Sequence, residues 1–161
     1  MSTPSRIILK VRKKDVGRKM KFDLSKLPIP FGEWIEKDDK GKVWLDQRGK
    51  DVCRMVTLKG DYIGIYCHWD GYVEDGVGET LKKYFNDYET ALNLIVGGFC
   101  SGISNGYVRH YANRNGSRWR YIKPIQGTFD KVYGEIYGQY DYLFEDGVWK
   151  VGDKDKGFHK F

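Results

Sequence analysis

The hydrophobic positions of this chain change their spacing from that of strands to that of helices and back again. The run RIILKV at 6–11 is apolar and β-branched and ends at a cluster of charges, as a strand does. Leu81, Tyr84 and Phe85 fall at positions i, i+3 and i+4, the spacing of one helix face. Alternation returns near the C-terminus, in YDYLFEDGVWKVG. Strands and helices in separate segments predict an α+β domain.

Turn residues between the alternating runs predict a small, mostly antiparallel sheet built from hairpins. Such turns occur at Gly41, at Gly60-Asp61 and at Asp146-Gly147. The strands around them are predicted near 33–35, 42–46, 52–59, 62–69 and 140–151. The run 18–22 alternates charged and apolar residues, and we expect it to pair with the first strand. The last turn predicts a C-terminal β-hairpin.

Two to three short helices are expected between the hairpins. The first is predicted from Gly78 to Phe85. The second follows Asn86-Asp87, where Asp87 is a favourable N-cap, and ends at Gly97-Gly98. A third is predicted over 128–138, with a packed face composed of Phe129, Val132, Tyr133, Ile136 and Tyr137.

Length and composition favour a single α+β domain over 1–151. The chain has 161 residues, 40% of them hydrophobic, and contains no linker of low complexity. We expect the polar segment 152–161 to be a mobile tail. No apolar run approaches the roughly 18 residues that span a bilayer, and the N-terminus lacks a signal-peptide core. These features predict a cytoplasmic protein with no membrane partner.

The cysteines do not predict a metal site or a cofactor. Cys53, Cys67 and Cys100 are widely spaced and form no CxxC pair, so zinc of the usual spacing is not expected. We interpret them as reduced, buried thiols.

Charge is segregated along the chain, which has a net charge of +6. Residues 1–21 contain eight basic residues and only one acid, Asp15, whereas 61–79 is acidic and 91–127 contains no acid at all. A basic face attracts phosphates or acidic protein surfaces. We interpret the N-terminal lysines as a solvated face and give more weight to the segment 107–123.

That segment combines arginines, which contact phosphates, with aromatic rings, on which bases stack. In a strand, Arg118 and Arg120 would share one face and Trp119 the other, so a solvated basic strand is the alternative. The predicted partners are nucleic acid, a nucleotide or an acidic host protein. The candidate binding residues are Tyr72, Arg109, His110, Arg114, Arg118, Trp119 and Arg120.

His68 and Asp70 are the candidate catalytic residues. They share one face of a predicted strand end, whereas Cys67 points to the other face and cannot form a nucleophile–base pair with His68. The two could act as a general base with an orienting carboxylate, or as two metal ligands. Alternatively Asp70 caps a turn at Gly71 and His68 bonds a backbone carbonyl.

The stretch IYCHWDGYVEDGVGETLKKYFNDYETALNLIVGGFCSGI resembles a family of small proteins encoded by bacteriophages and prophages. The resemblance covers roughly 62–103 and 140–151. It rests on His68, Asp70, Gly71, Tyr72, Gly76, Gly78, Leu81, Tyr84, Asn86, Asp87, Leu94, Ile95 and Gly97. Members often carry Pro after the motif tyrosine, where this chain has Val73. The resemblance implies a phage origin and a role inside an infected bacterium.

Together these features favour a phage-encoded accessory protein that acts by binding in the host cytoplasm. One use of such binding would be to counter a host defence system. A small hydrolase or nuclease centred on His68 and Asp70 is an alternative. A minor structural protein of the virion is another.

Overall fold

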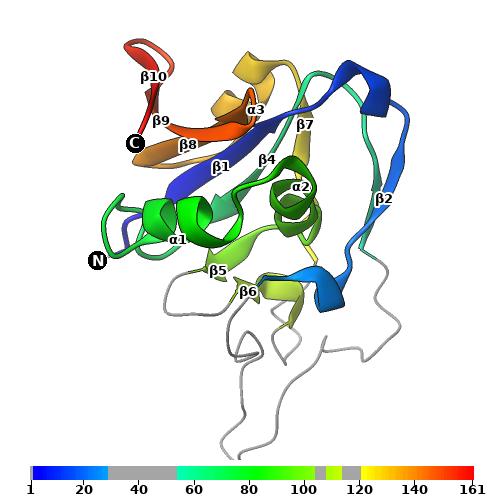
Figure 1. Ribbon diagram of the computed structural model, residues 1–161, viewed down its shortest axis with the longest axis horizontal. Coiled ribbons are helices and arrows are strands. Elements are labelled where there is room, and N and C mark those ends of the chain that lie inside the picture. The colour runs from blue at the N-terminus through cyan, green and yellow to red at the C-terminus, as the bar shows by residue number, and fades with distance from the viewer. Residues whose placement is uncertain (1, 29–53, 104–107, 114–120) are drawn as a thin grey trace, which may run out of the picture.

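A computed structural model describes residues 2–28, 54–103, 108–113 and 121–161. Within these residues the strands are β1 (Ser5–Lys10), β2 (Lys19–Lys21), β3 (Met55–Thr57), β4 (Tyr62–Cys67), β5 (Cys100–Gly102), β6 (Arg109–His110), β7 (Ile125–Gly127), β8 (Tyr140–Glu145), β9 (Val148–Asp153) and β10 (Gly157–Lys160). The helices are α1 (Val77–Tyr84), α2 (Tyr88–Val96) and α3 (Phe129–Glu135), with short 3-10 turns η1 (Lys13–Asp15), η2 (Leu24–Lys26) and η3 (Tyr111–Asn113). The α+β class predicted from the sequence is confirmed (Figure 1).

One large sheet organises the molecule, in the order β10-β9-β8-β1-β4-β5-β6, with β7 also paired to β4. β1 lies at its centre, antiparallel to β4 and parallel to β8. Ile7, Ile8 and Leu9 have no exposed surface, because both faces of β1 are covered. This explains why the first strand is continuously apolar rather than alternating.

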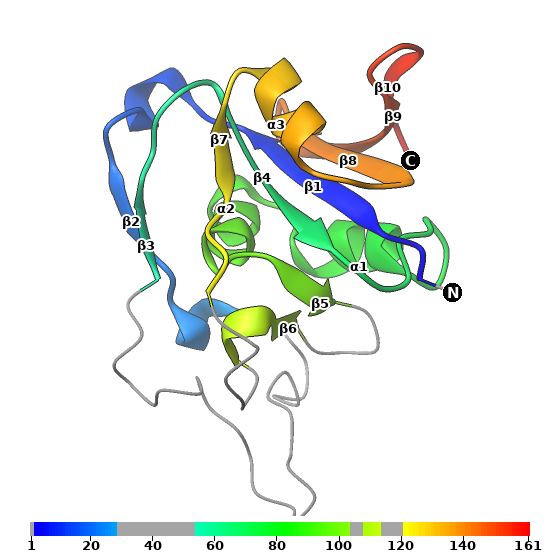
Figure 2. The ribbon, with the colours of Figure 1, turned by 180° about the vertical axis from the view of Figure 1, so that it is seen from behind.

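Helices cover both faces of the sheet (Figures 1 and 2). α1 and α2 pack on one face, over Ile7, Leu9 and Ile63. α3 packs on the other face, over Ile8. It approaches β4 closely at Gly64, where an added Cβ would lie 2.7 Å from Val132 Cγ1.

The pairing of the strands differs from the predicted hairpins. Strands do occur within 52–59 and 62–69, but β3 pairs with β2 in a separate ribbon, whereas β4 joins β1. The run 18–22 therefore does not pair with the first strand. β4 buries four of its six residues, whereas β3 buries only Val56. The predicted hairpin around Gly41 lies outside the described residues.

The three predicted helices are present, and α2 begins at its predicted cap. The Asp87 carboxylate accepts a hydrogen bond of 2.9 Å from the Thr90 N–H at the start of α2. Thr128 caps α3 in the same way. α3 ends at Glu135, before the predicted 138, and Tyr137 is 64% exposed rather than packed.

The C-terminal β-hairpin is present, and the chain continues beyond it as a strand. Asp146 and Gly147 both have positive φ, 56° and 81°, as a tight hairpin turn requires. The prediction of a mobile tail over 152–161 is wrong, because β10 pairs with β9. Phe158 also packs edge-on against Phe129, at 5.8 Å between ring centroids.

Within the described residues, no helix has the length and apolar character needed to cross a membrane.

Candidate functional site

The motif around His68 lies where β4 leaves the sheet. Ile63, Ile65 and Cys67 are buried on the α1–α2 side, as strand alternation predicted. On the other side, the Tyr66 hydroxyl and His68 Nδ1 share a hydrogen bond of 2.6 Å. His68 also contacts the Trp69 ring edge-on, at 4.6 Å between centroids. The imidazole is therefore oriented by a tyrosine and a tryptophan.

Asp70 forms the turn that leads into α1. It has a positive φ of 57°, and its carbonyl accepts the Val77 N–H at 2.7 Å. Its carboxylate accepts a bond of 3.2 Å from the hydroxyl of Tyr72, which is 40% exposed. Asp70 rather than Gly71 thus adopts the left-handed backbone. Within the described ranges, no three His, Cys, Asp or Glu side chains converge on a point that could hold a metal ion.

A row of core side chains crosses three strands beside this motif. Cys67 is opposite Cys100, and Cys100 is opposite His110. The hydrogen bond with Cys67, together with burial, raises the pKa of the Cys100 thiol well above its usual value. Both thiols are free and buried, as expected from the sequence, while Cys53 lies outside the described residues.

His110 belongs to this core rather than to a surface. It has no exposed area, and its Nε2–H donates to the Leu94 carbonyl at 2.8 Å. Burial lowers the pKa of His110 to about 3, with a smaller contribution from Arg54, so the ring is neutral at pH 7. A ligand at the molecular surface would not contact this side chain.

About half of the predicted basic-aromatic segment falls within the described residues, namely 108–113 and 121–123. Arg109 is partly buried on β6, and its guanidinium lies over Gly102. The other predicted binding residues of the segment lie outside the described ranges: Arg114, Arg118, Trp119 and Arg120.

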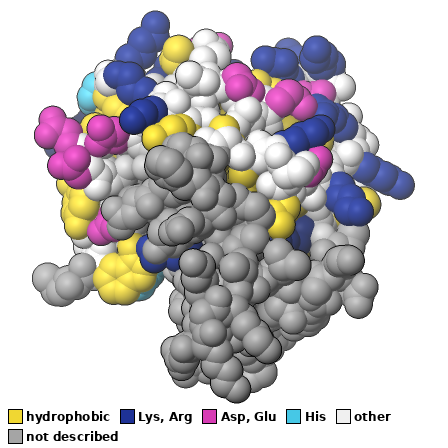
Figure 3. Space-filling view, turned by 60° about the horizontal axis from the view of Figure 1, so that its bottom comes forward, with side chains coloured by type: hydrophobic (Ala, Val, Ile, Leu, Met, Phe, Trp, Pro, Cys, Tyr) yellow, Lys and Arg dark blue, Asp and Glu magenta, His cyan; other side chains and the backbone are white. Residues whose placement is uncertain are grey.

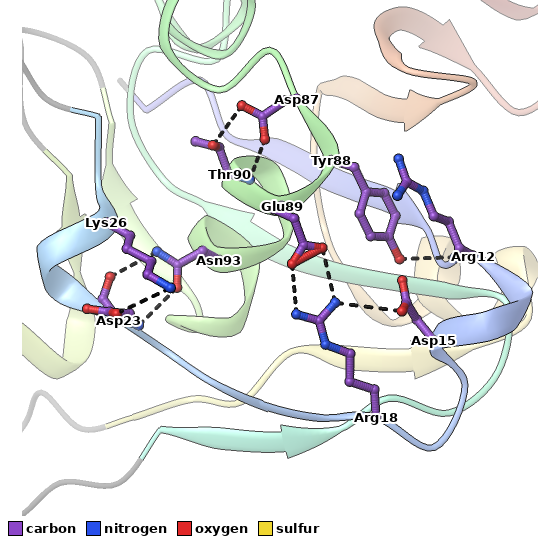
Figure 4. Close-up of polar contacts among 10 residues, drawn as sticks. All are labelled: Arg12, Asp15, Arg18, Asp23, Lys26, Asp87, Tyr88, Glu89, Thr90 and Asn93. Atoms are coloured by element: carbon purple, nitrogen blue, oxygen red, sulfur yellow. Dashed lines mark hydrogen bonds and ion pairs between the residues drawn. The ribbon is translucent and has the colours of Figure 1, made fainter.

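The described structure instead presents a second basic surface, residues 10–26, which we call the basic edge. It contains eight basic residues and two acids. The basic edge leaves the end of β1, passes through η1 and β2 and ends at η2, and it runs beside α2 (Figures 1 and 4). Two hydrogen bonds join it to Asn93 of α2, whose side chain bonds both the N–H and the carbonyl of Asp23.

Some cations of the basic edge are neutralised by acids. The Arg18 guanidinium binds both carboxylate oxygens of Glu89, at 2.7 and 3.0 Å, and these contacts raise its pKa. Lys10 lies 3.8 Å from Glu145, and Lys26 lies 3.8 Å from Asp23.

Four lysines of the basic edge are exposed and have no ion pair with any described residue: Lys13, Lys14, Lys19 and Lys21. β2 buries Met20 and turns the lysines on either side of it outward. Figure 3 shows Lys and Arg side chains along the right-hand side of the molecule, the side of β2 in Figure 1, with some Asp and Glu side chains among them. Another group of acidic side chains lies at the left, below further Lys or Arg side chains.

Two grooves flank the first turn of α2. One, of about 290 Å³, is lined chiefly by Arg18, Lys19, Lys21, Asp23, Lys26 and Glu89. The other, of about 360 Å³, is lined chiefly by Lys10, Arg12, Lys13, Tyr88, Glu145 and Asp146. The excess of basic residues in 10–26 was visible in the sequence. The grooves were not, because α2 and the β8–β9 turn supply their other walls.

Comparisons of this chain with protein-family models, with curated proteins and with solved structures found no match.

Proposed function

We propose that this protein binds nucleic acid through the basic edge. The observation that carries the proposal is the set of four exposed lysines without ion pairs among the described residues. Lysines that contact backbone phosphates release condensed counterions, which supplies most of the free energy of non-specific binding.

The chemistry of the surface favours nucleic acid over an acidic protein. Lysine is depleted from protein–protein interfaces, which rely on buried aromatic and arginine anchors. The only aromatic residue of the basic edge, Phe22, is buried and cannot anchor a partner. Phosphate contacts, in contrast, require only exposed cations in a row, and β2 supplies two on one face.

The resemblance to phage-encoded proteins supports a biological setting for this proposal. An accessory protein made during infection would meet nucleic acid in the cytoplasm of the host bacterium, and binding there is one way to counter a defence system. This setting rests on the residues shared with that family.

The test compares two double variants that change the net charge equally. We expect Lys19→Ala with Lys21→Ala to weaken binding to single-stranded DNA, duplex DNA or RNA, and to reduce the salt slope of the affinity by about two. Lys131→Ala with Lys156→Ala removes two exposed lysines outside the basic edge and should leave the slope unchanged. Fluorescence anisotropy between about 50 and about 200 mM salt measures both.

Exposed lysines contribute little to folding, so neither double variant should change the free energy of unfolding by more than about 0.5 kcal/mol. If the unaltered protein binds none of the three nucleic acids at low salt, the proposal is wrong, and an acidic protein becomes the better candidate for this surface.

A further inference from the structure

Arg12 differs from the other cations of the basic edge because its side chain is held in place without an acid. Its guanidinium carbon lies 3.9 Å from the centroid of the Tyr88 ring, and its backbone N–H donates to the Tyr88 hydroxyl at 3.0 Å (Figure 4). Tyr88 is only 6% exposed and begins α2 directly after the capping residue Asp87. A rigid ring therefore fixes the position of the guanidinium.

The donors of this guanidinium are not used by a carboxylate in the described part of the chain. Arg18 provides the contrast, since Glu89 binds it through two bonds and Asp15 lies 3.6 Å away. In Figure 4, Arg18 points toward Glu89, whereas Arg12 lies beside the ring of Tyr88. Stacking on an aromatic face leaves the planar fork of N–H groups available for a bidentate acceptor.

The acids of the groove beside Arg12 already have other partners. Glu145 lies 3.0 Å from Lys150 and 3.8 Å from Lys10, and Asp146 lies 3.5 Å from Lys150. The groove of about 360 Å³ therefore contains two acids that are paired and two cations that are not, Arg12 and Lys13. An incoming anion would meet those two cations.

We infer that Arg12 is a phosphate-binding residue that fixes one backbone phosphate of the bound nucleic acid in this groove, beside Lys13. The inference rests on the proposed function and names the residue at which the strand is positioned. A stacked guanidinium loses less conformational freedom on binding than a mobile lysine, so its contact should be stronger. The bidentate geometry of a guanidinium also matches two oxygens of one phosphate.

The experiment uses the full chain and a short labelled DNA strand of mixed sequence. We expect Arg12→Ala to weaken binding about tenfold at about 50 mM salt and to lower the salt slope by about one. Arg12→Lys keeps the charge but loses the fork, and should recover the slope without recovering the full affinity. Lys131→Ala removes one exposed charge from α3 and should change neither quantity.

Arg12→Met covers Tyr88 with an apolar chain of similar length, so a binding defect shared by the Ala and Met variants does not reflect exposure of the ring. If the unaltered chain binds DNA and Arg12→Ala behaves like Lys131→Ala, this inference is wrong while the proposed function stands. If the unaltered chain binds no nucleic acid, both fail. If low concentrations of a free mononucleotide displace the strand, Arg12 binds a nucleotide rather than a backbone phosphate, and the inference is wrong.

Discussion

At the scale of single residues, His110 links the stability of the core to pH. Its ring is buried without exposed area beside the buried Arg54, and it donates one hydrogen bond to the Leu94 carbonyl. Protonation would place a second positive charge in this core. Burial therefore lowers the pKa of His110 to about 3, against about 6.5 in an unfolded chain.

We expect this difference to appear as a slope of stability against pH. Neutral His110 makes its full contribution to the free energy of unfolding above about pH 6.5, and this contribution is lost as the pH falls toward 3. The unfolded state then binds one more proton, so the loss is about 1.4 kcal/mol per pH unit. Urea unfolding between about pH 7 and about pH 5 measures the slope. His110→Gln should flatten this slope, and an equally steep decline in that variant would disprove the assignment.

At the scale of elements, the first turn of α2 supports the basic edge. The Asp87 carboxylate bonds both the N–H and the hydroxyl of Thr90. The next two residues are Tyr88, on whose ring the Arg12 guanidinium stacks, and Glu89, which binds Arg18. The N-cap therefore fixes the helix end that positions two arginines of the basic edge.

Replacing this cap should destabilise the fold. We expect Asp87→Ala to lower the free energy of unfolding by about 1 kcal/mol, because an N–H of α2 loses its acceptor. The adjacent Asn86 is exposed and does not cap the helix, so Asn86→Ala is the matched control. Urea midpoints of the two variants give the comparison, and equal midpoints would show that the cap contributes nothing.

At the scale of the whole molecule, opposite charges lie at opposite ends of β1. The basic edge begins at Lys10, the last residue of β1, whereas the loop 70–76, which precedes α1 and contains Asp70, Glu74 and Asp75, bonds through the Gly71 N–H to the Thr3 carbonyl, just before β1 begins. A strand of this length separates its ends by roughly 17 Å. The resulting charge asymmetry would orient the protein as it approaches a polyanion.

This asymmetry predicts how salt acts on the kinetics. We expect added salt to lower the association rate constant for DNA more than it raises the dissociation rate constant, because long-range attraction is screened before close contacts are broken. Stopped-flow fluorescence at several salt concentrations would separate the two constants. If salt changes only the dissociation rate constant, the electrostatic field of the protein does not orient it as it approaches DNA.

Local sequence was enough to predict the features that depend on neighbouring residues. Strand alternation placed Ile63, Ile65 and Cys67 on one face. The cap at Asp87 and the turn at Asp146-Gly147 followed from the local chemistry of those residues. Such signals act within a few residues, so a single chain segment contains all the information.

Tertiary structure alone decided which segments meet. It paired β2 with β3, and it placed His110 in the core although its sequence neighbours suggested a surface. It also brought Arg12 onto Tyr88, 76 residues away. Sheet partners and burial depend on competition among all the apolar surfaces of the chain, and no local pattern records the outcome of that competition.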